Sequence, residues 1–389
     1  VLEGADAGEG IRVESEQLTI GTADGNDLVL NDSTVSRYHL ELTRTERGVL
    51  VRDLGSTNGT FASNVFVERG TVAVGTVLRL GRLRVQVEDG GVGTADVFDG
   101  DVLEGMWGRS QATRRLMAQI VKVAQTQASV LIIGESGTGK ELVARALHRL
   151  SERSPQPYEI VDCASLSPQL IASELFGHDK GSFTGADRRH IGAFERAHGG
   201  TLFLDEVGEL PANLQPTLLG ALERRRFRRV GGREDFGVDV RVVSATNRDL
   251  RTEVNTNAFR LDLFYRLAVV TLRIPPLRDR PEDIPLLAAH FARSVGYEAP
   301  IEDLFPPEVM TALMRHPWPG NVRELRNLVE ATVAMGETPE LVVPDATSSA
   351  TAEAGGGIQV GHLLDLPYKE ARKAVLEQFE AMYLPHLLE

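Results

Sequence analysis

The sequence predicts a multi-domain protein in which a β-sandwich precedes an α/β domain of the P-loop type, with a group of helices after it. Short apolar runs separated by Gly, Asn and Asp occupy residues 11–88, and no long helical pattern interrupts them. An apolar strand at 130–133 then runs directly into a glycine-rich loop, and apolar residues recur at helical spacing up to residue 150. A chain of 389 residues is long enough for two or three such domains.

Composition and charge narrow the class of protein. The formal net charge of −13 argues against a dominant nucleic-acid-binding surface, although a local basic patch can lie within an acidic total. Cys163 is the single cysteine, so no intrachain disulfide can form, which fits a reducing cytoplasm. The sequence has no run of about 18 apolar residues that would indicate a membrane span. After Val1 it shows no secretory leader, which would have a charged segment followed by an apolar one. We therefore expect a cytoplasmic protein with no membrane partner, and we expect this chain to be a fragment.

The first domain is expected over residues 1–90. Its loops carry Gly21, then Ser36-Arg37-Tyr38-His39, then Gly55-Ser56-Thr57-Asn58-Gly59. This constellation resembles the forkhead-associated (FHA) domain, a β-sandwich whose loops bind phosphothreonine, and Arg-mediated phosphate recognition is a recurrent mode of peptide binding. The resemblance implies that Ser36 and Arg37 hold the phosphate and Asn58 the peptide backbone. It also implies that His39 braces the loop from inside.

This domain departs from the family in one place. Gly21 is followed by Thr22, whereas the family usually has Gly-Arg, so one phosphate-binding guanidinium is missing. A hydrogen bond to a charged group contributes roughly 1.5–3 kcal/mol, so its loss weakens phosphopeptide binding by about 10- to 100-fold. Two interpretations stay open: a sensor for a phosphothreonine protein or Ser/Thr kinase, and a sandwich that serves only as an intramolecular docking module. Residues 91–101, rich in Gly and Asp without a period, are expected to form a linker.

The glycine-rich loop predicts a phosphate-binding site. Glycines let backbone N–H groups turn inward without interference from a Cβ, and Lys140 adds a point charge at the start of the following helix. The expected ligand is ATP or GTP, held by Gly134, Glu135, Ser136, Gly137, Thr138, Gly139, Lys140 and Glu141. Glu141 stands where the general motif has the Ser or Thr that ligates Mg²⁺. The metal must therefore depend on another carboxylate.

Two further strands, at 158–161 and 201–206, fit a parallel sheet around this loop. The second is an apolar run that ends in Asp205 and Glu206. We expect Asp205 to hold Mg²⁺ through water. We expect Glu206 to polarise the water that attacks the phosphate in line.

The segment between these strands contains Gly181-Ser182-Phe183-Thr184-Gly185-Ala186. It resembles the signature loop Gly-Ala-Phe-Thr-Gly-Ala of bacterial enhancer-binding proteins, the AAA+ activators of sigma-54 RNA polymerase, with Ser182 in place of the first Ala. In that family the loop contacts sigma-54, so the resemblance implies this role for Phe183, Thr184 and Gly185. The match continues from about Met106 to Pro344, with the motifs in the family's order.

Further site residues follow from the resemblance one at a time. Asn247 would sense the γ-phosphate, and Arg323 would reach the nucleotide from a helical lid. Arg260 and Arg266 would be supplied to the ATP of a neighbouring subunit. These two are six residues apart, which does not align them on one helix face, so we expect them to contribute differently. The adenine pocket would begin at Trp107 and Gly108.

The domain limits expected from this match are 102–275 for the α/β subdomain and 276–344 for the lid. Asp162 stands where many relatives have an Asn that restrains the catalytic Glu, and two facing carboxylates repel unless one is protonated or a cation intervenes. The run Arg224–Arg229 precedes the family's second pore loop, which favours an interface or pore role over contact with duplex DNA.

The tail has two expected parts. Residues 345–364 contain an aperiodic stretch of Ala, Ser, Thr, Glu and Gly and are expected to form a flexible linker. Residues 365–389 are expected to begin a DNA-binding domain that is truncated before any helix-turn-helix. Contact with promoter enhancer DNA is therefore expected only outside this chain.

These features predict an Mg²⁺-dependent ATPase that forms a head-to-tail homo-oligomeric ring, expected to be a hexamer. The ring would remodel the sigma-54 RNA polymerase holoenzyme, and the FHA-like sandwich would regulate it. Two alternatives remain. One is a phosphopeptide-binding scaffold whose ATPase is a nucleotide-gated structural part, and the other is a different AAA+ remodeller.

Overall fold

The computed structural model describes residues 1–3, 6–11, 17–45, 48–88, 97–165, 167–183 and 186–336. The chain divides into a compact unit at 1–339 and a second unit at 340–389, which lies outside the described residues. The expected flexible linker and the expected start of a DNA-binding domain therefore stay predictions. Within the described ranges, the helices are all too short or too polar to cross a membrane.

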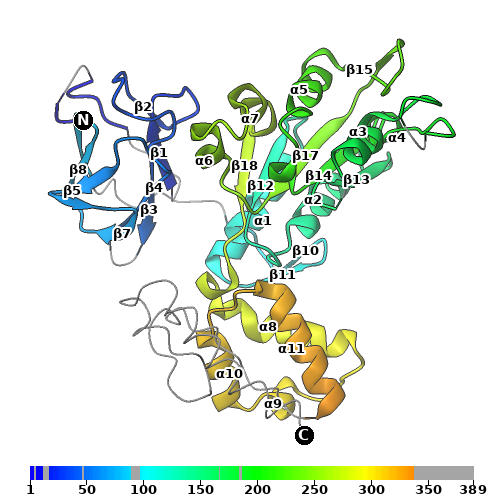
Figure 1. The fold of residues 1–389 in the computed structure, drawn as a ribbon. Coiled ribbons are helices and arrows are strands. Elements are labelled where there is room, and N and C mark those ends of the chain that lie inside the picture. Colours follow the sequence, from blue (N-terminus) through cyan, green and yellow to red (C-terminus); the bar gives the residue numbers. More distant parts are fainter. Residues whose placement is uncertain are drawn as a thin grey trace, which may run out of the picture. The chain divides into compact units, whose positions relative to one another are not determined.

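The N-terminal domain is a sandwich of two sheets, as the sequence predicts (Figure 1). One sheet has the order β2-β1-β3-β4-β7 and the other β6-β5-β8-β9. Strand β9 buries Leu83 and Val85 and exposes Arg84 and Gln86, because successive side chains of a strand point to opposite faces. The strands are β1 Gln17–Gly21, β2 Leu28–Val29, β3 Leu40–Thr45, β4 Gly48–Asp53, β5 Thr60–Ala62, β6 Val65–Phe66, β7 Arg69–Val72, β8 Val77–Leu80 and β9 Leu83–Gln86.

The central domain contains a five-stranded sheet of order β13-β14-β17-β12-β18, in which all neighbours are parallel. Both faces of the sheet are buried: Leu131 of β12 packs into one apolar cluster, whereas Val130 and Ile132 pack into another. The strands are β12 Val130–Ile133, β13 Tyr158–Asp162, β14 Thr201–Asp205, β17 Arg241–Thr246 and β18 Val270–Arg273. The helices are α1 Gln111–Ala124, α2 Lys140–Arg149, α3 Pro168–Phe176, α4 Ala193–Arg196, α5 Gln215–Arg224, α6 Leu250–Asn255 and α7 Leu261–Leu267, with a 3-10 turn η1 at Val207–Glu209.

The strand order brings the functional strand ends together. Strand β12 ends at the glycine-rich loop, β14 ends at Asp205, and β17 ends one residue before Asn247. Because β17 lies between β14 and β12, these three carboxyl ends are neighbours at one edge of the sheet. Ligands of open α/β sheets bind at this edge.

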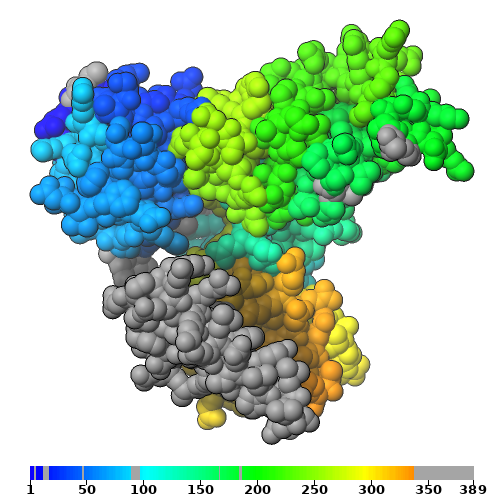
Figure 2. Space-filling view, viewed as in Figure 1, coloured from blue at the N-terminus to red at the C-terminus, as the bar shows by residue number. Residues whose placement is uncertain are grey.

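Two small ribbons complete the α/β domain. Strands β10 Val102–Leu103 and β11 Met106–Trp107 form one, and β15 Arg226–Arg228 and β16 Asp235–Gly237 form the other. The segment after α3 joins the second ribbon through two hydrogen bonds, from Asp179 N to Val230 O at 3.2 Å and from Val230 N to Gly177 O at 2.9 Å. Figure 2 shows this part of the domain as a lobe projecting from the green surface.

The helical lid follows β18. Its 3-10 turns are η2 Leu277–Asp279 and η3 Pro281–Asp283, and its helices are α8 Ile284–Ser294, α9 Ile301–Leu304, α10 Pro307–Arg315 and α11 Asn321–Met335. Trp318 is fully buried, and its indole N–H donates to Leu313 O at 2.8 Å, so the large ring is packed without an unsatisfied donor. Helix α11 ends at Met335 and is capped by Gly336, whose φ of 74° is accessible to glycine at little cost. The structure confirms the helical lid, while the boundaries assigned from the sequence stay predictions.

Candidate functional site

The glycine-rich loop has the backbone that a phosphate cradle requires. Gly137 and Gly139 have φ of 76° and 102°, a region that other residues enter at a steric cost. A Cβ on Gly137 would lie 2.3 Å from Gly320 O, and one on Gly134 would lie 2.8 Å from Thr138 Oγ1. The loop delivers the chain directly into α2, whose first N–H groups are free of helical partners and favour an anion. The predicted nucleotide loop therefore fits a phosphate group.

Lys140 and Glu206 form the central ion pair of the site. Lys140 Nζ lies 3.0 Å from Glu206 Oε1 and donates to Gly134 O at 3.1 Å. The lysine side chain is 8% exposed, so solvent screens this pair weakly. Glu206 Oε2 also accepts the backbone N–H of Asn247 at 3.1 Å. Three predicted site residues are thus brought together, with Asn247 contributing its backbone.

Glu206 is held in a strained conformation. Its φ and ψ of 47° and 49° lie in the left-handed region, which typically costs of order 1–3 kcal/mol at a non-glycine residue. The surrounding contacts to Lys140 and Asn247 maintain it. Strain of this kind concentrates at functional sites, and here it aims the carboxylate at the lysine of the phosphate loop.

Asp205 is placed to serve the metal. It ends β14, and its Oδ1 accepts the N–H of Glu206 at 3.0 Å. Burial raises the pKa of Asp205 above its usual range, and the neighbouring charge of Glu206 adds to this effect. Within the part of the chain that the structure describes, no group of three or more His, Cys, Asp or Glu side chains could hold a metal by itself. This donor set suits Mg²⁺, which is usually held by one or two carboxylates together with phosphate oxygens and water.

Asp162 does not restrain Glu206 through the contacts that the structure gives it. It pairs with Asp205 in the β13–β14 register, and its Oδ1 accepts the N–H of Ala164 at 2.8 Å. Glu206 is instead held by Lys140 and Asn247. Next in the chain, Cys163 is 2% exposed, and burial raises the pKa of its thiol to about 12, so it is a packed apolar residue and not a reactive thiolate.

The lid reaches the phosphate loop through Arg323. Its Nη1 donates to Ser136 Oγ at 3.1 Å, and its backbone N–H donates to Gly137 O at 3.3 Å. The predicted second sensor therefore touches the loop that it was expected to serve.

Two lid residues that the sequence reasoning missed reinforce this contact. Arg278 forms a bidentate pair with Glu135, and the buried Asn321 donates to Glu135 Oε2 and Ser136 O, both at 3.1 Å. The Arg278 pair lowers the pKa of Glu135, so this carboxylate stays ionised. The charged run that begins at Arg278, five residues after the end of β18, was the available signal.

The predicted adenine pocket also joins the lid. Trp107 stacks on His290 of α8, with ring centroids 4.5 Å apart. Position 108 has room only for glycine, because a Cβ there would lie 2.4 Å from Thr113 Cγ2. The fully buried Asp283 accepts the N–H groups of Arg109 and Ser110, both at 2.6 Å. This carboxylate was missed by the sequence reasoning, and it joins the segment after Trp107 and Gly108 to the lid.

Arg260 and Arg266 point to different surroundings, as their spacing predicts. Arg260 caps the start of α7 and pairs with Asp262 at 2.7 Å, with both side chains about half exposed. Arg266 lies in the last turn and donates to Leu222 O at 3.0 Å. Both groups are thus engaged away from the phosphate loop of their own chain. A role toward a neighbouring subunit stays a prediction.

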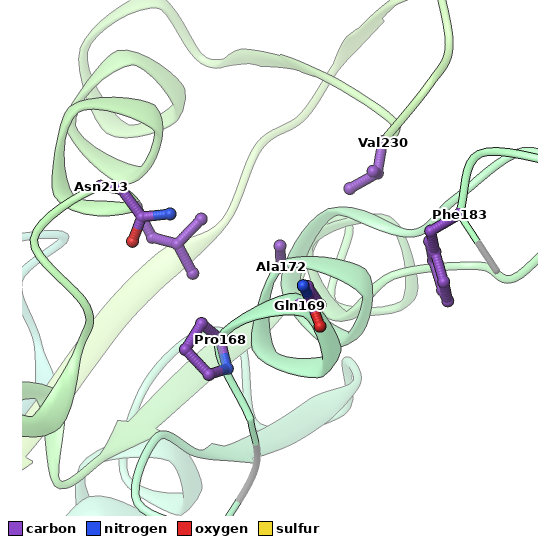
Figure 3. A pocket seen from close by; sticks show the side chains of 7 residues that line it. Pro168, Gln169, Ala172, Phe183, Asn213 and Val230 are labelled. Carbon is purple, nitrogen blue, oxygen red and sulfur yellow. The ribbon is translucent and has the colours of Figure 1, made fainter.

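The predicted sigma-54 loop is described up to Phe183. The Phe183 ring packs edge-to-face with His178, with ring centroids 4.9 Å apart. The Phe183 side chain also lines a cavity of about 230 Å³ (Figure 3). The other lining residues are Pro168, Gln169, Ala172, Asn213, Leu214 and Val230. Thr184 and Gly185 lie outside the described residues, so their part in the loop stays a prediction.

The arginine run after α5 is partly structural. Arg228 pairs with Asp235 at 2.6 Å across the β15–β16 ribbon. Arg229 is buried, pairs with Glu195 at 2.6 Å, and stacks over the ring of Phe236 at 3.9 Å. These two side chains hold the projecting lobe together, which leaves a smaller basic surface than the sequence suggests.

The loops of the sandwich have the internal brace that the FHA resemblance implies. His39 is fully buried, its Nδ1 accepts the N–H of Ser36 at 3.1 Å, and its Nε2 lies 3.2 Å from Gly59 O. Burial lowers the pKa of His39, in agreement with a neutral ring that donates from Nε2. Ser36 Oγ accepts the N–H of Thr57 at 3.0 Å, and Asn58 Nδ2 donates to Thr34 O at 2.8 Å.

Arg37, the predicted phosphate ligand, binds the ATPase domain of its own chain. Its Nη2 donates to Val254 O at the end of α6, and to Asn257 Oδ1 at 3.0 Å. The adjacent Tyr38 is fully buried against Phe264 of α7, with ring centroids 5.5 Å apart. The intramolecular docking that the sequence left open is therefore present. A role in binding phosphothreonine stays a prediction.

Comparison with known proteins assigns the central domain and the lid. Residues 106–273 match the sigma-54 interaction domain, and residues 278–355 match the AAA+ ATPase lid domain. Residues 1–91 match the cytoplasmic domain of the inner membrane component of T3SS.

Individual proteins are similar to parts of this chain. The transcriptional regulatory protein ZraR of Escherichia coli (strain K12) is 47% identical over 278 residues, which are 70% of this chain and 63% of ZraR. A crystal structure of NtrX from Brucella abortus is 39% identical with a TM-score of 0.56, and it covers 72% of this chain and 62% of that one. A structure from an analysis of phosphothreonine-dependent FHA domain interactions is 33% identical and covers 22% of this chain and 88% of its own, with a TM-score of 0.21.

The chain thus spans less than two thirds of the length of ZraR and of NtrX. The sigma-54 interaction domain and the AAA+ lid domain nevertheless match consecutive segments of the chain. Residues 106–273 therefore form a sigma-54 interaction domain like that of the bacterial enhancer-binding proteins, and this central domain is an AAA+ ATPase.

Proposed function

We propose that this protein activates transcription by coupling ATP hydrolysis to remodelling of the sigma-54 RNA polymerase holoenzyme, as a homo-oligomeric ring in the cytoplasm. The observation that carries the proposal is the convergence of Lys140, Glu206 and Asn247 at neighbouring strand ends. The match of 106–273 to the sigma-54 interaction domain supports the choice of partner.

Nucleotide binding begins with a change of partner at Lys140. Its ammonium group, now paired with Glu206, moves to the negative charge of the phosphates held by the glycine cradle. Glu206 is thereby released and can orient the attacking water and accept its proton. Asp205 is the residue that would hold Mg²⁺, and a bound Mg²⁺ would neutralise phosphate charge.

A neighbouring subunit completes the site in this proposal. Arg260 and Arg266 lie on or next to α7 and are engaged away from their own phosphate loop. An arginine supplied across an interface typically contributes 10³- to 10⁵-fold in rate. A head-to-tail contact that delivers it closes into a ring when the rotation permits.

Capture of sigma-54 tests the partner. The wild-type chain is expected to retain sigma-54 in the presence of ADP and aluminium fluoride, which mimic the transition state. Thr184→Ala is expected to lose this capture while keeping most of the ATP turnover, because the loop is far in sequence from the nucleotide motifs. Ser294→Ala, at an exposed position at the end of α8, serves as the matched control.

Three outcomes would contradict parts of this proposal. Capture by the Thr184→Ala protein would show that the loop assignment is wrong. ATP turnover by the wild-type chain without any sigma-54 capture would favour a different AAA+ remodeller, and absence of turnover would favour a phosphopeptide-binding scaffold.

We also propose that the sandwich recognises phosphothreonine on a partner protein or on a Ser/Thr kinase. The arrangement of Ser36, Arg37 and Asn58 around the loops braced by His39 supports this role. A phosphothreonine carries close to two negative charges near neutral pH, and one guanidinium can still form a charge-assisted pair with it. Because Thr22 replaces the usual arginine, the expected binding is weak and sensitive to salt.

Paired threonine peptides test this sensor. Peptides of one sequence, with and without the phosphate, are titrated onto the full chain. The phosphorylated form is expected to bind more tightly, Arg37→Ala to remove the preference, and Thr22→Arg to strengthen binding roughly 10- to 100-fold. Equal affinity of the wild-type chain and of Thr22→Arg for the two forms would mean that the sandwich senses no phosphate.

A further inference from the structure

The recognition face of the sandwich is already in use within the chain. We define the docking face as Arg37, Tyr38 and Leu54 of the sandwich, together with their partners on α6 and α7. Arg37 Nη2 donates to Val254 O, to Asn255 O at 3.4 Å and to Asn257 Oδ1 at 3.0 Å. These are oxygen acceptors gathered at the end of one helix. They occupy the guanidinium as the oxygens of a phosphate would.

Asn255 clamps the backbone of the sandwich. Its Nδ2 donates to Tyr38 O at 2.6 Å and to Leu54 O at 3.1 Å, while its Oδ1 accepts the N–H of Tyr38 at 3.3 Å. One amide side chain thus bonds to two segments of the sandwich, next to the predicted phosphate and peptide ligands. Since Asn255 belongs to α6, changing it leaves the sandwich's own residues intact.

Aromatic packing closes the contact. Tyr38 is fully buried against Phe264 and joins the apolar cluster of the ATPase domain together with Leu54. On the neighbouring loop, the N–H of Gly25 donates to Tyr265 Oη at 3.1 Å. A phosphopeptide lying over the loops would need the space that α6 and α7 now fill.

Charged pairs at the side of the docking face set its orientation. Glu41 of β3 is 6% exposed in its side chain and lies 3.2 Å from Arg251 and 2.6 Å from Arg273. Arg52 pairs with Asp249 at 3.0 Å. Removing one partner of a buried pair is costly, because the other charge stays behind without compensation. The pairs therefore hold the sandwich in one register on the ATPase domain.

We propose that a phosphothreonine segment and the α6–α7 surface compete for this one face, so that phosphopeptide binding releases the sandwich from the ATPase domain. The inference rests on the phosphothreonine recognition proposed above. It follows from Arg37 being both the evident phosphate ligand and the residue bound to the end of α6. Thr22 offers no second guanidinium, so phosphate cannot bind strongly while Arg37 stays engaged.

Loosening the contact from the ATPase side tests the competition. Asn255→Ala removes three hydrogen bonds to the sandwich without touching its recognition loops. If docking blocks the face, this variant of the full chain binds a phosphothreonine peptide at least about tenfold more tightly than wild type, since a larger fraction is competent to bind. Glu41→Gln, which weakens docking from β3, is expected to shift affinity the same way. Thr256→Ala, on the exposed end of α6, leaves it unchanged.

Amide hydrogen exchange measures directly whether the sandwich is docked on α6. The phosphorylated peptide is expected to increase amide exchange in residues 250–257 of the wild-type chain, and the unphosphorylated peptide to leave it unchanged. Circular dichroism confirms that each variant is folded.

Each outcome separates this inference from the function on which it rests. Phosphate-dependent binding of equal strength in wild type, Asn255→Ala and Glu41→Gln would overturn the competition and leave phosphothreonine recognition standing. Equal affinity for both peptides in all three proteins, with exchange showing that α6 is exposed in Asn255→Ala, would overturn phosphothreonine recognition and the competition with it.

Discussion

Two cations predicted to bind phosphate, Lys140 of the ATPase domain and Arg37 of the sandwich, are both held by acceptors of the protein itself. Lys140 pairs with Glu206, the predicted catalytic carboxylate, which directly follows β14 of the central sheet. Arg37 bonds to the end of α6, more than 200 residues along the chain and in another domain. The first can be freed by rotating two side chains, whereas the second requires a domain contact to open. The same chemistry therefore gives a local switch in one place and a long-range one in the other.

The largest effect is expected when the ATP site loses the arginines of its neighbour. Arg260→Ala or Arg266→Ala should bind ATP normally yet hydrolyse it about 10³- to 10⁵-fold more slowly, since developing charge on the transferred phosphoryl group is no longer neutralised. Mixing either variant with Lys140→Ala, which should not bind ATP, should partly restore turnover. One subunit then supplies the arginine and the other the intact pocket.

Absence of rescue in these mixtures, with assembly confirmed by sedimentation, would favour a structural role for the two arginines. In that case the nucleotide site would be complete within one chain, without an arginine from a neighbouring subunit.

A smaller but still large effect is expected at Glu206. Glu206→Gln should keep ATP binding, because the carboxylate that competes with phosphate for Lys140 is removed. The same change should lower turnover by roughly 10²- to 10⁴-fold, because the general base is lost. Binding is measured with a fluorescent ATP analogue and turnover by phosphate release. Glu223→Gln, at an exposed position on α5, is the control. Near-normal turnover in the Glu206→Gln protein would remove this residue from the mechanism.

The smallest effect concerns the brace of the sandwich. Burial lowers the pKa of His39 below its ordinary value near 6.5, so the unfolded chain takes up more protons than the folded domain as pH falls below 6.5. Above pH 6.5 the neutral His39 ring leaves the free energy of unfolding of the sandwich at its full value. Below that pH the free energy of unfolding decreases by up to about 1.4 kcal/mol per pH unit, which changes the unfolding equilibrium constant roughly tenfold.

Amide exchange in residues 36–42 of the full chain, corrected for the intrinsic rate, measures this loss between pH 7 and pH 5. His39→Asn should remove the pH dependence, while His198→Asn, at an exposed position, should retain it. The same acid dependence in the His39→Asn protein would assign the effect to another group.

Much of the nucleotide site was predictable, because its chemistry lies in contiguous residues at strand ends. The glycines of the loop and Lys140 act through backbone geometry that the local sequence dictates. Parallel strands end at one edge, which brings Asp205 and Asn247 to the loop once the strands are recognised. The fold of the sandwich followed in the same way from alternating strands and turn residues.

The missed contacts join segments that are far apart in sequence. Arg278 is 143 residues from Glu135, and Arg37 is 217 residues from Val254. Such pairs depend on how surfaces of different domains fit together, and no local pattern encodes that fit. Motif reasoning could therefore name Arg37 as a phosphate ligand, but it could not show that an internal partner already holds it.

The central claim, that ATP hydrolysis by this chain remodels sigma-54 polymerase, is tested most directly by promoter opening. Sigma-54 holoenzyme bound to a promoter is incubated with saturating amounts of the chain, and melted DNA is detected with permanganate. Open complexes are predicted with ATP and the wild-type chain, and none with a non-hydrolysable analogue or with Thr184→Ala. Undiminished ATP hydrolysis by the wild-type chain together with a promoter that stays closed would contradict the account.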